Sequence, residues 1–219
     1  MRMSRRRDPA AEAGFTLIEL VVTVAIVGVV VTALTGVVLS YLRNTVDTQA
    51  RLSESHDVQF VSAYWQRDVA SIGVRSSSYD TATHSFPLTQ SVDLPACPLT
   101  GDAAGATPAA TLAWSEHDSL TSTDPGTTVK VTYAYQSSAE GGRLYRVRCG
   151  SRPATVEVAD RLADAPVLAC ANGAGDSISC TGSGDDVPVV VTLALSIHDS
   201  TGIDLPTYAA TLLGERRQT

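Results

Sequence analysis

One apolar run near the N-terminus limits what this chain can fold into. From Phe15 to Leu39 the sequence carries a single charged residue, Glu19. At about 1.5 Å of rise per residue, roughly 25 helical residues span about 37 Å, which is enough to cross a bilayer core of about 30 Å with some tilt. A carboxylate inside such a segment is costly and indicates a function, although an acid this close to the start of the run can also stay hydrated at the membrane surface.

The residues around Glu19 form a more specific pattern. The string Gly14-Phe15-Thr16-Leu17-Ile18-Glu19-Leu20 combines a glycine, an aromatic residue, an acid and an apolar run, behind a short leader with four arginines. It resembles the processing site of type IV pilins and type II secretion pseudopilins. The resemblance implies that a prepilin peptidase cleaves after Gly14, that the new N-terminal Phe15 is methylated, and that Glu19 sets the register of the subunit during assembly.

The basic leader, residues 1–14, predicts the orientation in the membrane. Arginines before an apolar run hold it on the cytoplasmic side, so we expect a single span over residues 15–40 in the cytoplasmic membrane and an outer domain. After assembly that domain would lie in a periplasmic or cell-surface filament. A secretory signal peptide has an apolar region of only about 7–15 residues, followed by a small-residue cleavage site. This run is longer and no such site follows it, so we reject cleavage by ordinary signal peptidase.

Charge excludes one class of partner. The whole chain has a formal net charge of −7, and −9 remains once the leader is removed. This balance argues against general binding to nucleic-acid phosphates, which requires clustered cations. The partners that the resemblance implies are a prepilin peptidase, other pilin or pseudopilin subunits that contact the N-terminal helix, an inner-membrane assembly platform and membrane lipid.

Two glycines, Gly28 and Gly36, interrupt the apolar run. Glycine costs about 1 kcal/mol relative to alanine within a helix, so these positions can loosen the helix or allow close helix packing. In the family that the motif resembles, many members carry glycine at the position of Gly28 and a helix-breaking proline at that of Gly36, and this segment can unwind inside a filament. The proline is missing here, and glycine is only a partial substitute for it.

The helix is expected to continue over residues 41–72. Residues 42–57 are largely polar and predict a stalk, whereas apolar residues from position 58 recur at helical spacing and predict a docked half. This stripe comprises Val58, Val61, Trp65, Val69 and Ile72. The segment 64–69 resembles a region of the larger, J-type minor pseudopilins and related minor pilins. With the large outer domain, it favours a minor subunit that primes or tips a filament.

Residues 73–219 predict a β-rich outer domain. Residues 74–110 are expected to form a long irregular connection with one or two short strands. Further strands are predicted over 111–114, 129–135, 144–148, 155–158, 189–197 and 207–213, with hairpins around 136–142 and 199–202. Arg143, Arg146 and Arg148 are expected on a solvated strand face. A long N-terminal helix packed on an antiparallel sheet gives a predicted α+β, pilin-like fold.

Four cysteines lie outside the predicted membrane span: Cys97, Cys149, Cys170 and Cys180. An even number in an oxidising compartment predicts disulfides, with three possible connectivities. We favour Cys170–Cys180, which would tie the ends of a glycine-rich loop, together with Cys97–Cys149. No C-x2-C or paired-histidine spacing is present, so zinc is disfavoured, and we predict neither a metal site nor a cofactor.

The sequence also argues against catalysis, because it contains none of the common hydrolase, zinc-protease, P-loop or dinucleotide motifs. The alternative to a filament subunit is a single-pass protein with an uncleaved anchor. Its outer domain would bind a ligand or act as a thiol enzyme through Cys149 and His198. Asp185-Asp186 and the turn at 199–204 are calcium candidates, but solvated turn residues are favoured since the spacing of an EF-hand is absent.

Overall fold

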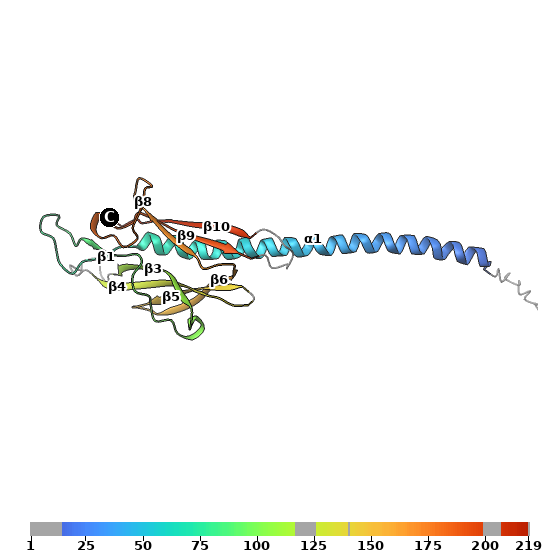
Figure 1. The fold of residues 1–219 in the computed structure, drawn as a ribbon, viewed down its shortest axis with the longest axis horizontal. Coiled ribbons are helices and arrows are strands. Elements are labelled where there is room, and N and C mark those ends of the chain that lie inside the picture. Colours follow the sequence, from blue (N-terminus) through green and yellow to red (C-terminus); the bar gives the residue numbers. More distant parts are fainter. Residues whose placement is uncertain (1–14, 117–125, 140, 199–206, 219) are drawn as a thin grey trace, which may run out of the picture. The chain divides into compact units, whose positions relative to one another are not determined.

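The computed structural model describes residues 15–116, 126–139, 141–198 and 207–218. The chain divides into two compact units, residues 1–48 and residues 49–219. A single helix, α1 (Leu17–Ser71), contributes to both, which confirms that the helix continues beyond the apolar run (Figure 1). Thr16 starts α1 because its carbonyl oxygen accepts from the N–H groups of Glu19, at 3.1 Å, and Leu20, at 3.2 Å.

The second unit contains an eight-stranded antiparallel sheet in the order β3-β4-β5-β6-β9-β7-β8, with β10 on the other side of β9. The sheet strands are β3 (Thr107–Glu116), β4 (Thr127–Gln136), β5 (Gly142–Cys149), β6 (Ala154–Leu162), β7 (Val167–Ala171), β8 (Ser177–Ile178), β9 (Val190–Ile197) and β10 (Tyr208–Glu215). Two short strands, β1 (Val74–Arg75) and β2 (Leu88–Thr89), pair separately. The short 3-10 helices are η1 (Gly101–Ala103) and η2 (Gly184–Asp186).

The fold is α+β and pilin-like, as the sequence predicts. The strands of both predicted hairpins pair, β4 with β5 and β9 with β10, and the predicted turn at 199–202 lies outside the described residues. Two predicted strands are longer than expected, because β3 covers residues 107–116 and β6 covers residues 154–162. β7 and β8 were not predicted. The short β7 stretch, Val167–Ala171, lacks a clear alternation of polar and apolar residues, and it forms a strand by pairing with β9.

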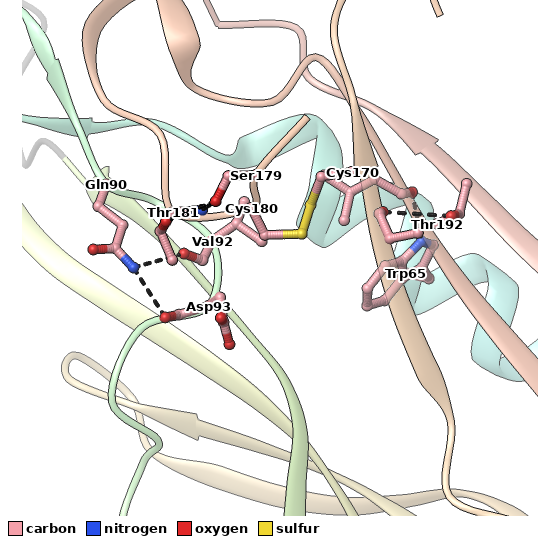
Figure 2. Close-up of a disulfide and its surroundings, with 11 residues drawn as sticks. Trp65, Gln90, Val92, Asp93, Cys170, Ser179, Cys180, Thr181 and Thr192 are labelled. Carbon is pink, nitrogen blue, oxygen red and sulfur yellow. Dashed lines mark hydrogen bonds between the residues drawn. A yellow bond between two sulfur atoms is a disulfide. The ribbon is translucent and has the colours of Figure 1, made fainter. Parts of the chain in front are cut away.

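The predicted stripe on the last part of α1 forms the core. Val61, Trp65, Val69 and Ile72 are all fully buried, against sheet residues that include Tyr133. Figure 2 shows Trp65 beside the Cys170–Cys180 disulfide, and its indole N–H donates to the carbonyl oxygen of Val191 on β9 at 3.3 Å. The core therefore holds the end of the helix against β9 and β4 together.

A second layer covers the other face of β4 and β5. The irregular segment that contains Cys97 and Ala103 buries both residues against Tyr145 and Val147 of β5. The Cys97–Cys149 disulfide ties this segment to the end of β5, and the hydroxyl of Thr132 on β4 accepts the Cys97 N–H at 2.9 Å. β4 is therefore buried on both faces.

Candidate assembly site on the N-terminal helix

The N-terminal motif lies at the start of α1. Gly14 falls outside the described residues, whereas Phe15 and Glu19 are both described and exposed. The hydroxyl of Thr16 lies 3.4 Å from the Glu19 N–H, so Thr16 caps the helix, and Glu19 is the acid of the first helical turn. An acid at this end of a helix is favourable because the helix dipole is positive there. The carboxylate therefore belongs to the same helix end as the predicted new N-terminus.

Every described residue from 15 to 44 is exposed, including the long run of valines and leucines. The segment Leu17–Val46 is long and apolar enough to cross a membrane. Leaving apolar surface in water costs roughly 25 cal/mol per Å², so such a segment needs lipid or other helices around it. The arrangement fits a single-pass anchor.

Three threonine hydroxyls within the apolar segment are satisfied along the helix. The hydroxyls of Thr23, Thr32 and Thr35 donate to carbonyl oxygens four residues earlier, at 2.7–2.8 Å. Gly28 and Gly36 lie inside continuous α1, and an added Cβ at either would have nothing within 4 Å. The role of these two glycines in flexibility stays a prediction.

Comparison with family models identifies this same segment. Residues 9–35 match the model described as the prokaryotic N-terminal methylation motif. The chain therefore carries the prepilin-type methylation motif. With the apolar helix, the motif supports a type IV pilin or pseudopilin that prepilin peptidase processes, and it favours a structural subunit over an enzyme. A comparison with curated proteins found no match.

The docked end of α1 holds a buried ion pair that the sequence analysis missed. Arg146 of β5 donates from Nε and Nη2 to the Asp68 carboxylate, at 2.6 and 2.8 Å, and the Tyr133 hydroxyl donates to the same carboxylate at 2.8 Å. Asp68 and Arg146 are 2% and 5% exposed. The guanidinium also lies 5.0 Å from the centre of the Tyr64 ring. We call Asp68, Arg146 and Tyr133 the helix-docking network.

This network overturns the prediction of a solvated arginine face. Arg143 is exposed, but Arg146 is buried, and half-buried Arg148 lies 3.2 Å from Glu116. A signal was present, because Arg146 and Arg148 follow Leu144 by two and four residues in the strand and so share its core-facing side. Asp68 likewise follows Trp65 by three residues on the buried side of α1.

Burial and pairing change the protonation of the network. Burial of the Tyr133 phenol, followed by the charge of Asp68, raises the Tyr133 pKa well above its usual range. Burial alone would lower the pKa of Arg146, but its hydrogen bonds and its attraction to Asp68 outweigh that effect and raise it. Both groups therefore keep their protons, and each donates to the Asp68 carboxylate.

The structure excludes a thiol enzyme that uses Cys149, and one of the two calcium candidates lies outside the described residues. All four cysteines are paired, as Cys97–Cys149 and Cys170–Cys180, which is the favoured connectivity. Cys149 therefore has no thiol for the proposed pair with His198. Among the described residues, no group of three possible ligands that could hold a metal ion is found, and the turn at 199–204 lies outside them.

Replacing Asp68 by asparagine should destabilise the outer domain strongly. The substitution preserves shape but leaves the Arg146 charge buried without a counter-charge, which costs about 3–5 kcal/mol. Urea unfolding followed by tryptophan fluorescence measures the change, and Arg67→Gln, at an exposed neighbour, should stay within about 0.5 kcal/mol of wild type. The combination Asp68→Leu, Arg146→Met and Tyr133→Phe should recover most of the loss. A mild Asp68→Asn effect would contradict the assigned role.

Stability should fall in alkaline solution through Tyr133. The unfolded chain ionises this phenol from about pH 10, whereas the folded chain keeps the proton because its pKa is raised, so the stability is present below pH 10 and is lost as the pH rises. Between pH 9 and 11 the wild type should lose about 1 kcal/mol more unfolding free energy than Tyr133→Phe. Urea titrations at pH 9 and pH 11 measure the loss of unfolding free energy in each protein. An equal loss in wild type and Tyr133→Phe would show that Tyr133 ionises normally in the folded state.

Proposed function

We propose that this chain is a minor subunit that joins, primes or caps a type IV pilus or a type II secretion-type pseudopilus. The single observation that carries the proposal is the N-terminal methylation motif at the head of an exposed apolar helix. A major subunit is less favoured because the outer domain is large and tied by two disulfides. The segment 64–69 adds its resemblance to J-type minor pseudopilins.

The proposal assigns a role to each part of the chain. Residues 1–14 are the cytoplasmic leader, 15–40 the membrane-spanning half of the helix, 41–72 the stalk and docked half, and 73–219 the outer domain. Arginines in the leader keep it inside the cell during insertion. Prepilin peptidase then removes the leader and the amine of Phe15 becomes the new N-terminus. The assembly platform of the inner membrane moves the mature subunit into the filament.

Electrostatics explain why Glu19 would matter in that filament. Helices that bundle away from water and lipid headgroups surround Glu19 with a medium of low dielectric constant, where an unpaired carboxylate is expensive. The ammonium group of Phe15 on a neighbouring subunit can neutralise it. Since only one stagger between the helices brings the two charges together, the pair would select that stagger.

The competing function is an uncleaved membrane anchor for an outer domain that binds a ligand. The thiol-enzyme form of this alternative has lost its support, because Cys149 is joined to Cys97. The two remaining functions differ in the N-terminus of the cellular protein, which can be measured directly.

Processing should depend on prepilin peptidase. Intact-mass and N-terminal peptide analysis of the membrane-extracted protein should find a chain beginning at N-methylated Phe15 when the peptidase is present, and the full leader when it is absent. The reason is that cleavage after Gly14 requires this enzyme. A chain that retains Met1 in the presence of the peptidase would refute the filament function and favour the anchor.

Substitution of Glu19 should separate processing from assembly. Glu19→Ala should still be cleaved after Gly14 but should enter filaments poorly, because the buried N-terminal ammonium of a neighbour loses its counter-charge. Glu19→Asp retains the charge and should assemble better than Glu19→Ala. The measurement is the fraction of processed subunit in sheared or pelleted filaments, compared with the fraction left in the membrane. Wild-type incorporation of Glu19→Ala would remove the register argument.

A further inference from the structure

A cavity of about 370 Å³ lies in the outer domain beside the β1–β2 pair. Three stretches of chain that are distant in sequence line it: the β1–β2 pair with its connection, η2 and the C-terminal tail. The lining includes two cations, Arg75 and Arg216, and two acids, Asp80 and Asp185. Cavities of about 300–1,000 Å³ with a few converging polar groups are typical binding sites for small molecules. Neither the N-terminal motif nor the helix-docking network includes these residues.

Backbone groups hold Arg216 in place at this cavity. Its own N–H donates to the carbonyl oxygen of Val189 at 2.8 Å. The guanidinium Nε donates to the carbonyl oxygen of Pro188 at 3.2 Å, and its two Nη atoms donate to the carbonyl oxygens of Gln218 and Val187. The guanidinium is therefore oriented before any ligand binds, which lowers the entropic cost of binding.

The charge of Arg216 is not balanced by a carboxylate in the described part of the chain. There, the guanidinium donates only to neutral carbonyl oxygens. A guanidinium has five N–H donors, so some of them remain available to a ligand. Burial, followed by the charge of Arg75, lowers the pKa of Arg216. A half-buried cation beside a like charge is costly, and an anion in the cavity would offset that cost.

Arg75 lines the same cavity from β1. Its backbone N–H donates to the hydroxyl of Ser115 at 2.9 Å, and its Nη1 donates to the carbonyl oxygen of Phe86 at 3.1 Å. Both ends of this residue are therefore held by the fold. Guanidinium groups bind carboxylate and phosphate well because their planar fork can donate to two oxygens at once.

The two acids determine which kind of anion fits. Asp80 accepts from the N–H of Ala82 at 2.8 Å and from the hydroxyl of Thr83 at 3.0 Å, and these bonds lower the pKa of its carboxyl group. Asp80 is therefore ionised at neutral pH, and Asp185 is an exposed acid on η2. Two carboxylates in the lining oppose a multiply charged anion such as phosphate, but they can accept hydrogen bonds from hydroxyl groups.

We propose that this cavity binds a sugar acid, a ring that carries one carboxylate and several hydroxyl groups. The carboxylate accepts from Arg216 and Arg75, and the hydroxyl groups donate to Asp80 and Asp185. The rest of the lining offers apolar contact to the ring and further hydroxyl partners: Pro87, Leu88, Thr83 and Ser85. A peptide C-terminus also brings a carboxylate, but it lacks hydroxyl groups for this lining. The site goes beyond the proposed filament function and does not depend on it.

Binding of D-glucuronate to the full chain tests the proposal. The protein is kept in micelles of a detergent without sugar headgroups, and a ligand-observed NMR titration measures the dissociation constant. Wild type should bind glucuronate saturably. D-glucose and inorganic phosphate should each bind about tenfold more weakly or worse, because glucose lacks the carboxylate and phosphate meets the two acids.

Three substitutions separate this site from a general effect of charge. Arg216→Gln should weaken glucuronate binding about tenfold or more, since charged hydrogen bonds are lost. Arg217→Gln removes the same charge from the exposed next residue, which does not line the cavity, and should bind as wild type does. Asp185→Asn should bind phosphate several-fold more tightly than wild type, because one repulsive charge is gone. Urea unfolding followed by tryptophan fluorescence checks that each variant is folded, and the Asp185→Asn result stands even if Arg216→Gln is not.

Four results would overturn the proposal. Absence of saturable glucuronate binding to folded wild type would remove the ligand. An equal loss in Arg216→Gln and Arg217→Gln, or tighter binding of phosphate than of glucuronate, would indicate general attraction of anions. Unchanged phosphate binding in Asp185→Asn would place the anion outside this cavity. Tighter binding of glycylglycine than of glucuronate would assign the cavity to a peptide C-terminus.

Discussion

Attachment of the final turns of α1 to the sheet is the constraint on which the outer domain depends. The apolar side chains of Val61, Trp65 and Val69 provide most of the free energy, since fully burying such a side chain contributes about 1.5–3 kcal/mol. Burial of this kind has no direction and would tolerate rotation or sliding of the helix. The bidentate contact between Arg146 and Asp68 is directional, and any other placement of the helix would leave two buried charges unpaired. The ion pair therefore specifies the docked position more than it stabilises it.

The same helix meets two different requirements along its length. Its last turns find their apolar partners in their own domain, whereas residues 15–44 are exposed and lack such partners within the described chain. This division explains how one continuous helix can serve both the membrane and a folded domain. In the proposed assembly mechanism, Glu19 is the single acid in this exposed segment, and the proposal gives it a counter-charge on a neighbouring subunit.

Two edge strands of the sheet, β3 and β10, differ in how they are covered. The segment after α1 closes the β3 edge with backbone hydrogen bonds, and the Cys97–Cys149 disulfide fastens the irregular chain that covers β4 and β5. The Cys170–Cys180 disulfide closes the glycine-rich connection between β7 and η2 beside Trp65. These covalent and hydrogen-bonded covers leave β10, which pairs with β9 in one unbroken register, as the long edge with no partner among the described strands. An edge of this kind is suited to pairing with another strand.

The sequence by itself determined the features that are encoded locally. The methylation motif lies within a few consecutive residues, the apolar run sets the anchor by its length, and the spacing of Val61, Trp65 and Val69 identifies the buried face of the helix. Only the tertiary structure decided the role of Arg146, the existence of β7 and the protection of each edge. Arg146 finds Asp68 across 78 residues of sequence, and β7 becomes a strand because β9 offers it hydrogen bonds. Local periodicity predicts which way a side chain points. A buried charge or a weak strand is favourable only with a partner that lies far away in the sequence, and only folding brings that partner into contact.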